Sequence, residues 1–68
     1  MKYISNDQKL RIVRSGRTVQ SYTQRNYEGN PKATYIVKVV NYDGNLYWIE
    51  LLKEDGKEPQ ICEVSALN

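Results

Sequence analysis

The second half of the chain consists of runs rich in apolar residues that are separated by pairs of turn-forming residues. The segment Thr34–Tyr42 is dominated by β-branched and aromatic residues, which suit the pleated surface of a strand. Asp43-Gly44 follows, and this pair accepts the positive φ angles of a tight hairpin turn. The return run Leu46–Lys53 has the same character. The pattern predicts an antiparallel hairpin at the centre of the fold.

Three further segments are predicted to extend this hairpin into a larger sheet. Lys9–Arg14 is a short apolar-polar run that ends at the turn residues Ser15-Gly16. Arg17–Arg25 is rich in Thr, Val, Tyr and Gln and has no helical spacing. After a second Asp-Gly pair at Asp55-Gly56, Pro59–Val64 forms a final short strand. We therefore expect five strands in sequence and no substantial helix.

Both faces of the predicted central hairpin carry apolar side chains, whereas a sheet with one wet face would alternate more cleanly. Either the sheet curls into a small barrel, or its second face meets a partner. We favour the barrel, because closure removes most of the unprotected edges. The prediction is a single all-β domain over residues 1–68, a five-stranded antiparallel meander bent into an SH3-like barrel.

The residue types present disfavour catalysis. The chain contains no histidine and a single cysteine, Cys62. The commonest general base, the usual zinc ligand sets and an internal disulfide are therefore missing. Cys62 lies beside apolar residues and is expected to be a buried structural thiol. We expect no catalytic residue, no metal and no cofactor, and the unpaired cysteine with no export signal favours a cytoplasmic location.

Charge is unevenly distributed, although the net charge is only +2. Met1 to Lys38 contains eight basic and two acidic residues, a net +6, and Val39 to Asn68 contains two basic and six acidic residues, a net −4. A basic, tyrosine-lined first hairpin would suit single-stranded nucleic acid, with phosphates on the cations and bases on the rings. The candidate contacts are Arg11, Arg14, Arg17, Tyr22, Arg25, Tyr35 and Lys38. Alternatively, the first and last strands are neighbours and the two halves of the chain neutralise each other.

A second hypothesis starts from the apolar surface of the central hairpin. Tyr42, Trp48 and Leu52 are candidate interface residues, because Trp and Tyr are frequent anchors at protein interfaces. We expect a non-catalytic protein-interaction module or a small inhibitor or regulator, of the kind common among phage and mobile-element products. Its partner would be a protein or a second copy of the chain, and no membrane contact is expected. The alternative is the nucleic-acid-binding barrel. An aromatic cage for a quaternary amine, built from Tyr42, Tyr47 and Trp48, is disfavoured because strand alternation separates Tyr47 from Trp48.

Overall fold

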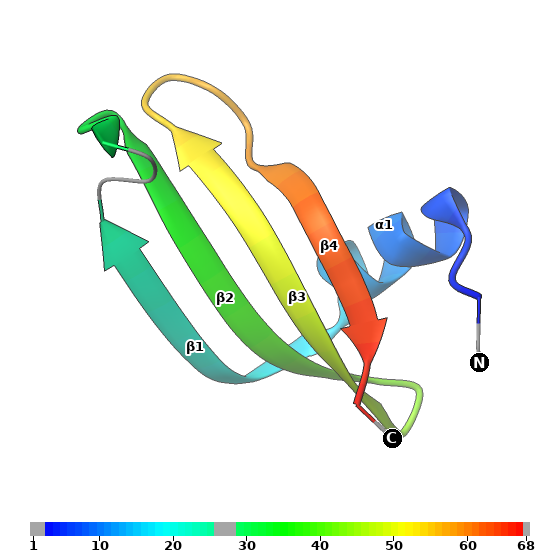
Figure 1. Ribbon diagram of the computed structural model, residues 1–68. Helices are drawn as coiled ribbons and strands as arrows, with labels where there is room; N and C mark the ends of the chain where they lie inside the picture. The colour runs from blue at the N-terminus through cyan, green and yellow to red at the C-terminus, as the bar shows by residue number, and fades with distance from the viewer. Residues whose placement is uncertain (1–2, 26–28, 68) are drawn as a thin grey trace.

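The computed structural model describes residues 3–25 and 29–67 and contains one helix followed by four strands (Figure 1). The strands form one antiparallel sheet in the order β1-β2-β3-β4, with β1 and β4 at its two edges. The mostly β, antiparallel class predicted from the sequence is confirmed. In the described residues no helix is long and apolar enough to cross a membrane. The elements are α1 (Asn6–Ser15), β1 (Arg17–Arg25), β2 (Ala33–Tyr42), β3 (Asn45–Glu54) and β4 (Gln60–Ala66).

The central hairpin is formed by β2 and β3, as the sequence predicts. Asp43 and Gly44 have φ angles of 53° and 81°, the positive values that a two-residue turn of this kind requires. From this turn the two strands pair in one uninterrupted register, from Tyr42 opposite Asn45 to Ala33 opposite Glu54. The turn therefore fixes which side chains of β2 and β3 share a face.

The prediction of a strand at Lys9–Arg14 is wrong, because this segment lies within α1. The Ser5 side chain caps the helix by accepting a hydrogen bond from the Gln8 backbone N–H at 3.2 Å. Asp7 lies in the first turn and Arg14 in the last, and both charges interact favourably with the helix dipole. Ile12 is the one helical residue that is fully buried. Val13 packs beside it, partly buried, so the apolar side of the helix has too few residues for a repeated spacing of three and four to appear in the sequence.

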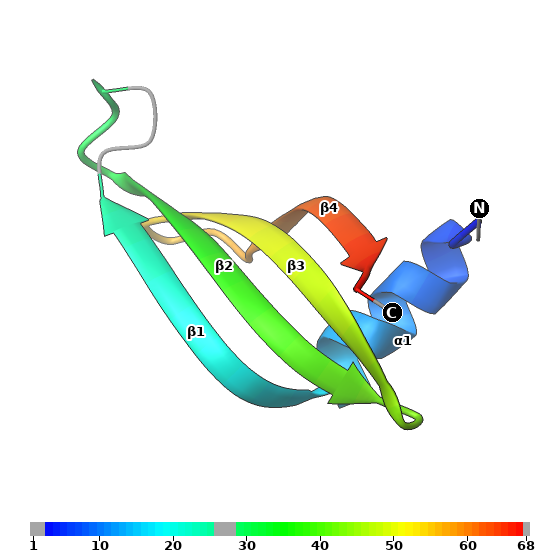
Figure 2. The same cartoon turned by 60° about the horizontal axis from the view of Figure 1, so that its bottom comes forward.

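The hydrophobic core lies between α1 and one face of the sheet, which we call the helix side. Ile12 packs there with Val40, Ile49, Val64 and their neighbours Tyr47 and Leu51. Figures 1 and 2 both place α1 on one side of the sheet, near the end where β2 and β4 finish and β3 begins. Core side chains on all three of these strands are buried against Ile12.

Gly16 connects α1 to β1 at a point of close approach. Its backbone N–H donates a 2.8 Å hydrogen bond to the Ile12 carbonyl and so ends the helix. A Cβ atom at this position would lie 2.4 Å from the Ile12 carbonyl oxygen and 2.9 Å from Cγ2 of Val40. The absence of a side chain therefore lets the helix end rest against β2.

Three finer expectations differ from the structure. The sheet has four strands, and the SH3-like barrel is not confirmed: β1 and β4 are the two edges of an open sheet. The apolar face that a barrel would enclose is covered by α1 instead, since the expected first strand is helical. Cys62, expected to be buried, is exposed. It is the extra residue of a bulge in β4, where Ile61 pairs with Leu51 and Glu63 pairs with Glu50.

Candidate interaction surfaces

The sheet has a second face that no helix covers in the described residues, and we call it the open face. Directly opposed residues in an antiparallel sheet point to the same side. Ile49 and its partner Val64 lie in the core, so the adjacent Glu50 and its partners Val37 and Glu63 point to the open face. Three rows of side chains cross this face: Gln20, Val39, Trp48 and Ser65; Tyr22, Val37, Glu50 and Glu63; and Tyr35, Leu52 and Gln60.

The middle of the open face is partly apolar. Val37 is only 6% exposed although no helix covers it. It lies between Tyr22 and Glu50 across the sheet and between Tyr35 and Val39 along its own strand. Tyr22 is 46% exposed, and Tyr35, Val39, Trp48 and Leu52 are half-buried. Large side chains therefore bury Val37 and leave part of their own surface in contact with solvent.

The Glu50 carboxylate is hydrogen-bonded to two aromatic side chains of the open face, Tyr35 and Trp48. The Tyr35 hydroxyl donates a hydrogen bond to Glu50 Oε1, and Trp48 Nε1–H donates one of 3.0 Å to Oε2. Hydrogen bonds from Tyr35, then from Trp48 and then with the Glu63 side chain hold the pKa of Glu50 below its usual value, because each stabilises the charged carboxylate. The carboxylate is therefore ionised at neutral pH, and its hydrogen bonds fix the positions of the two aromatic side chains.

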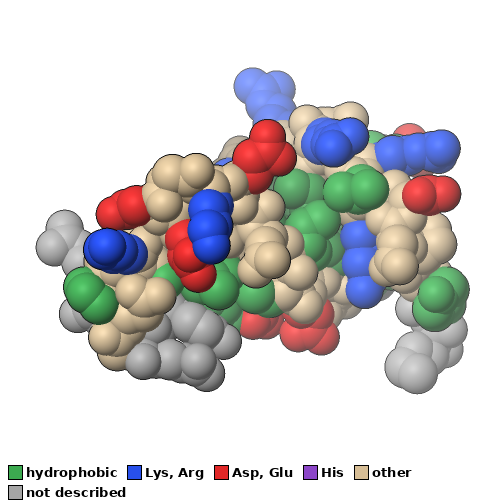
Figure 3. Space-filling view, turned by 90° about the horizontal axis from the view of Figure 1, so that it is seen from above, with side chains coloured by type: hydrophobic (Ala, Val, Ile, Leu, Met, Phe, Trp, Pro, Cys, Tyr) green, Lys and Arg blue, Asp and Glu red, His purple; other side chains and the backbone are tan. Residues whose placement is uncertain are grey.

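The strand positions separate the charges of the molecule between the two faces. Strand alternation places Glu50, Glu54 and Glu63 on the open face and Lys38 and Lys53 on the helix side. In Figure 3, which views the molecule from above, several Lys and Arg side chains lie toward the upper right, others lie beside acidic side chains at the left, and further acidic side chains project at the lower margin. The charged residues of β2, β3 and β4 are thus divided between the two faces.

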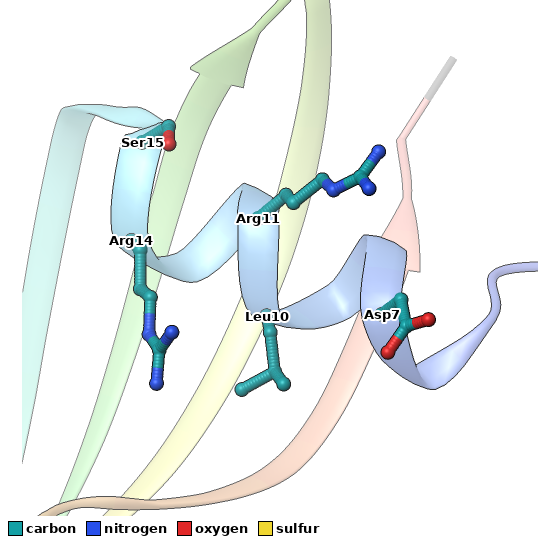
Figure 4. A pocket seen from close by; sticks show the side chains of 5 residues that line it. All are labelled: Asp7, Leu10, Arg11, Arg14 and Ser15. Atoms are coloured by element: carbon teal, nitrogen blue, oxygen red, sulfur yellow. The ribbon is translucent and has the colours of Figure 1, made fainter.

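The basic residues predicted to bind nucleic acid are not brought onto one surface. Arg11 and Arg14 lie on α1, where they line a hollow of about 260 Å³ together with Asp7, Leu10 and Ser15 (Figure 4). Lys38 is on the helix side. Arg17 is paired with Asn41 at the start of β1 and joins Tyr22 and Tyr35 on the open face. Arg25 ends β1 opposite Thr34, and its side chain is outside the described part of the chain.

The basic and acidic halves of the chain also do not neutralise each other across neighbouring strands. β1 and β4 are separated by β2 and β3. Among the side chains that the structure describes, the ion pair found is Lys57 with Glu54 at 3.2 Å, within one turn. The two halves therefore present their charges mainly to solvent.

The apolar interface candidates are divided between the faces. Trp48 and Leu52 lie on the open face, on either side of Glu50. Tyr42 is on the helix side, where its ring meets Tyr47 edge-on, with centroids 6.4 Å apart and an interplanar angle of 64°. This separation also removes the geometry of a cage shared by Tyr42, Tyr47 and Trp48.

Sequence reasoning missed the roles of Val37, Glu50 and Glu63. If the register is counted outward from the two-residue turn at Asp43-Gly44, Val37 lies opposite Glu50, so this pair could have been predicted from the sequence. The pairing of Glu50 with Glu63 was not available, because it depends on the bulge at Cys62. Within residues 3–25 and 29–67 there is no cluster of three or more His, Cys, Asp or Glu residues that would hold a metal ion.

Among the described residues, the open face is thus the surface that combines carboxylates with partly exposed aromatic side chains. No protein-family model, curated protein or solved structure matches this chain. Its function is therefore inferred from the arrangement of its own residues.

Proposed function

We propose that this protein is a non-catalytic protein-binding module whose contact surface is the open face of the sheet. The observation that supports this proposal is the one-sided cover of the sheet. α1 buries the helix side, whereas Tyr22, Trp48 and Leu52 remain partly exposed on the other side. Tyr and Trp are enriched among the residues that dominate binding free energy at protein interfaces.

The hydrogen bonds of Glu50 support binding by a rigid surface. Tyr35 and Trp48 are held by the same carboxylate, one on each oxygen. Side chains that are already fixed lose less conformational entropy when a partner binds. The open face therefore has large aromatic groups that need little rearrangement.

Nucleic-acid binding is the second candidate, and one observation favours it. Arg11 and Arg14 line the same hollow on α1 beside Ser15, and both arginines are exposed. Arginine donates planar, bidentate hydrogen bonds that match phosphate oxygens. In this alternative the helix would contact the backbone of the nucleic acid, and Tyr22 and Tyr35 would have no part in stacking because they lie on the open face.

Matched variants on the two surfaces distinguish these functions. Biotinylated protein is used to capture partners from nuclease-treated lysate of the cells that encode it, and Tyr22→Ser is compared with Leu10→Ser. The two residues have similar exposures, 46% and 40%, but lie on the open face and on α1. We expect a nuclease-resistant partner that is lost with Tyr22→Ser and retained with Leu10→Ser. A partner that disappears with nuclease, or that depends on Leu10, Arg11 and Arg14, would contradict the proposal.

A further inference from the structure

We infer that the partner of the open face is basic and places an arginine side chain against the carboxylates of Glu50 and Glu63. This inference rests on the proposed function and adds the chemistry of the partner to it. It follows from three features: the register of the two glutamates, the charges of the face and the aromatic side chains beside them.

The two carboxylates are directly opposed on neighbouring strands. Glu50 on β3 pairs with Glu63 on β4, and their side chains leave the same face of the sheet. The two side chains share a hydrogen bond that helps to lower the pKa of Glu50, but like charges in this position repel each other when both carboxylates are ionised. Neither residue forms an ion pair with a described Lys or Arg side chain. A cation between them would remove the repulsion.

Both carboxylates have acceptor positions available for such a cation. The oxygens of an ionised carboxylate offer about four lone-pair sites. Tyr35 and Trp48 donate one hydrogen bond to each oxygen of Glu50. Glu63 is exposed and lies on the edge strand. An incoming guanidinium could therefore approach over β4 and donate to both residues without displacing the bonds that fix the aromatic side chains.

The charges of the open face exclude an apolar partner and disfavour a second copy of the chain. An apolar partner would remove water from the ionised carboxylates and offer no hydrogen bond in return. A second copy packed face to face would bring its own Glu50, Glu54 and Glu63. Arg17 is the one cation that the described strand positions place on this face. A basic partner supplies the missing charge.

The aromatic neighbours favour arginine over lysine. Trp48 and Tyr35 are both hydrogen-bonded to Glu50, so their rings are held close to the carboxylate. A planar guanidinium forms bidentate bonds with carboxylates and stacks on aromatic rings, whereas an ammonium group acts as a compact point charge. Arginine can therefore use the carboxylates and the rings together.

A defined peptide tests this inference without knowledge of the natural partner. ¹⁵N-labelled protein is titrated with Ac-Gly-Arg-Gly-NH₂ at millimolar concentration, and the Trp48 indole N–H signal is followed by NMR. The neutral peptide Ac-Gly-Gln-Gly-NH₂ and the lysine peptide are run in parallel. We expect a saturable shift with the arginine peptide, a smaller one with lysine and none with glutamine. Equal shifts with arginine and glutamine, or no shift with arginine, would overturn the inference.

Two glutamate variants locate the binding site. Glu63→Gln removes one charge from the exposed edge of the open face, and Glu58→Gln removes one from the exposed turn before β4. We expect Glu63→Gln to weaken binding of the arginine peptide about fivefold and Glu58→Gln to leave it unchanged. Equal effects of the two variants would overturn the inference. If the arginine peptide fails to bind but capture of a partner still requires Tyr22, the chemistry inferred for the partner is wrong and the proposed function stands.

Discussion

The two faces of the sheet are built from the same strands but are stabilised in different ways. On the helix side, Ile12, Val40 and Ile49 have at most 2% of their surface exposed, so this face is a packed core. On the open face the central residue is Glu50, whose carboxylate is hydrogen-bonded to two half-buried aromatic side chains. The comparison indicates that the stability of the fold comes mainly from the helix side. The open face is then available for recognition.

The largest effect is expected from Ile12→Ala, which removes the side chain that joins α1 to the sheet. Ile12 is completely buried, and a truncation of this kind costs about 2–5 kcal/mol. The total stability of so small a domain is only about 3–5 kcal/mol. We expect the variant to be largely unfolded at room temperature, as measured by circular dichroism and urea titration.

Leu10→Ala is the matched control on the same helix, because Leu10 is 40% exposed. Its free energy of unfolding should lie within about 0.5 kcal/mol of the wild type. Equal destabilisation by both variants would show that α1 does not pack as described.

Gly16→Ala tests the close approach between the end of α1 and β2. Gly16 has φ −65° and ψ 139°, angles that alanine adopts readily, so the backbone alone would favour a small gain in stability. The added Cβ would instead lie 2.4 Å from the Ile12 carbonyl oxygen. We expect a loss of about 1–3 kcal/mol in urea unfolding. A gain in stability would mean that the helix end lies farther from the sheet.

Tyr35→Phe tests the hydrogen bonding on the open face. The variant keeps the ring and removes the hydroxyl that donates to Glu50. We expect the free energy of unfolding to fall by about 0.5–1.5 kcal/mol, less than for either helix-side variant. A loss as large as that of Ile12→Ala would contradict the division of roles between the faces.

The same contact predicts a dependence of stability on pH. Because the folded state holds the pKa of Glu50 below its usual value of 4.5, the ionised carboxylate stabilises the fold above that value. This contribution is lost as the pH falls through the lowered pKa of the folded state. Urea unfolding at neutral pH and at about pH 3 should show a smaller acid-induced loss in Glu50→Gln and in Tyr35→Phe than in the wild type. The same loss in all three proteins would rule out Glu50 as a contributor.

The smallest effect on stability is expected from Tyr22→Ser, because Tyr22 is 46% exposed on the edge strand β1. The free energy of unfolding should fall by about 0.2–1 kcal/mol, because the ring also covers Val37 across the sheet. The variant should nevertheless lose the proposed partner. A stable protein that still binds would place the contact surface elsewhere.

Four of the five expected strands and the turn at Asp43-Gly44 were predictable because local residues specify them, whereas the turn expected at Ser15-Gly16 is wrong because Ser15 is the last residue of α1. The segments predicted as the second to fifth strands all form strands, with ends that differ by at most two residues, and Asp43-Gly44 forms the expected turn. The helix was missed, since one fully buried side chain gives no repeating apolar pattern. The capping pair Ser5 and Gln8 was the available signal.

The barrel was predicted because both faces of the sheet carry apolar side chains, but in the structure α1 covers one of these faces. Apolar side chains on both faces require cover, and the sequence does not show that Ile12 covers one face from a helix. Trp48 and Leu52 do share the open face, while their role as contacts stays a prediction. The opposition of Glu50 and Glu63 could not be predicted. If the register of Leu51 and Ile61 continued without the bulge, Glu50 would lie opposite Cys62.

The central claim is that one face of the sheet is packed and the other is open to solvent, and a solvent-exposure map by NMR tests it most directly. A water-soluble paramagnetic agent is added to the labelled protein, and the relaxation of side-chain signals is compared between the faces. The structure predicts strong relaxation at Tyr22, Trp48 and Leu52 and protection at Val40, Ile49 and Val64. Protection of both sets in the isolated protein would contradict the claim, since it would require a closed barrel or a self-associated open face.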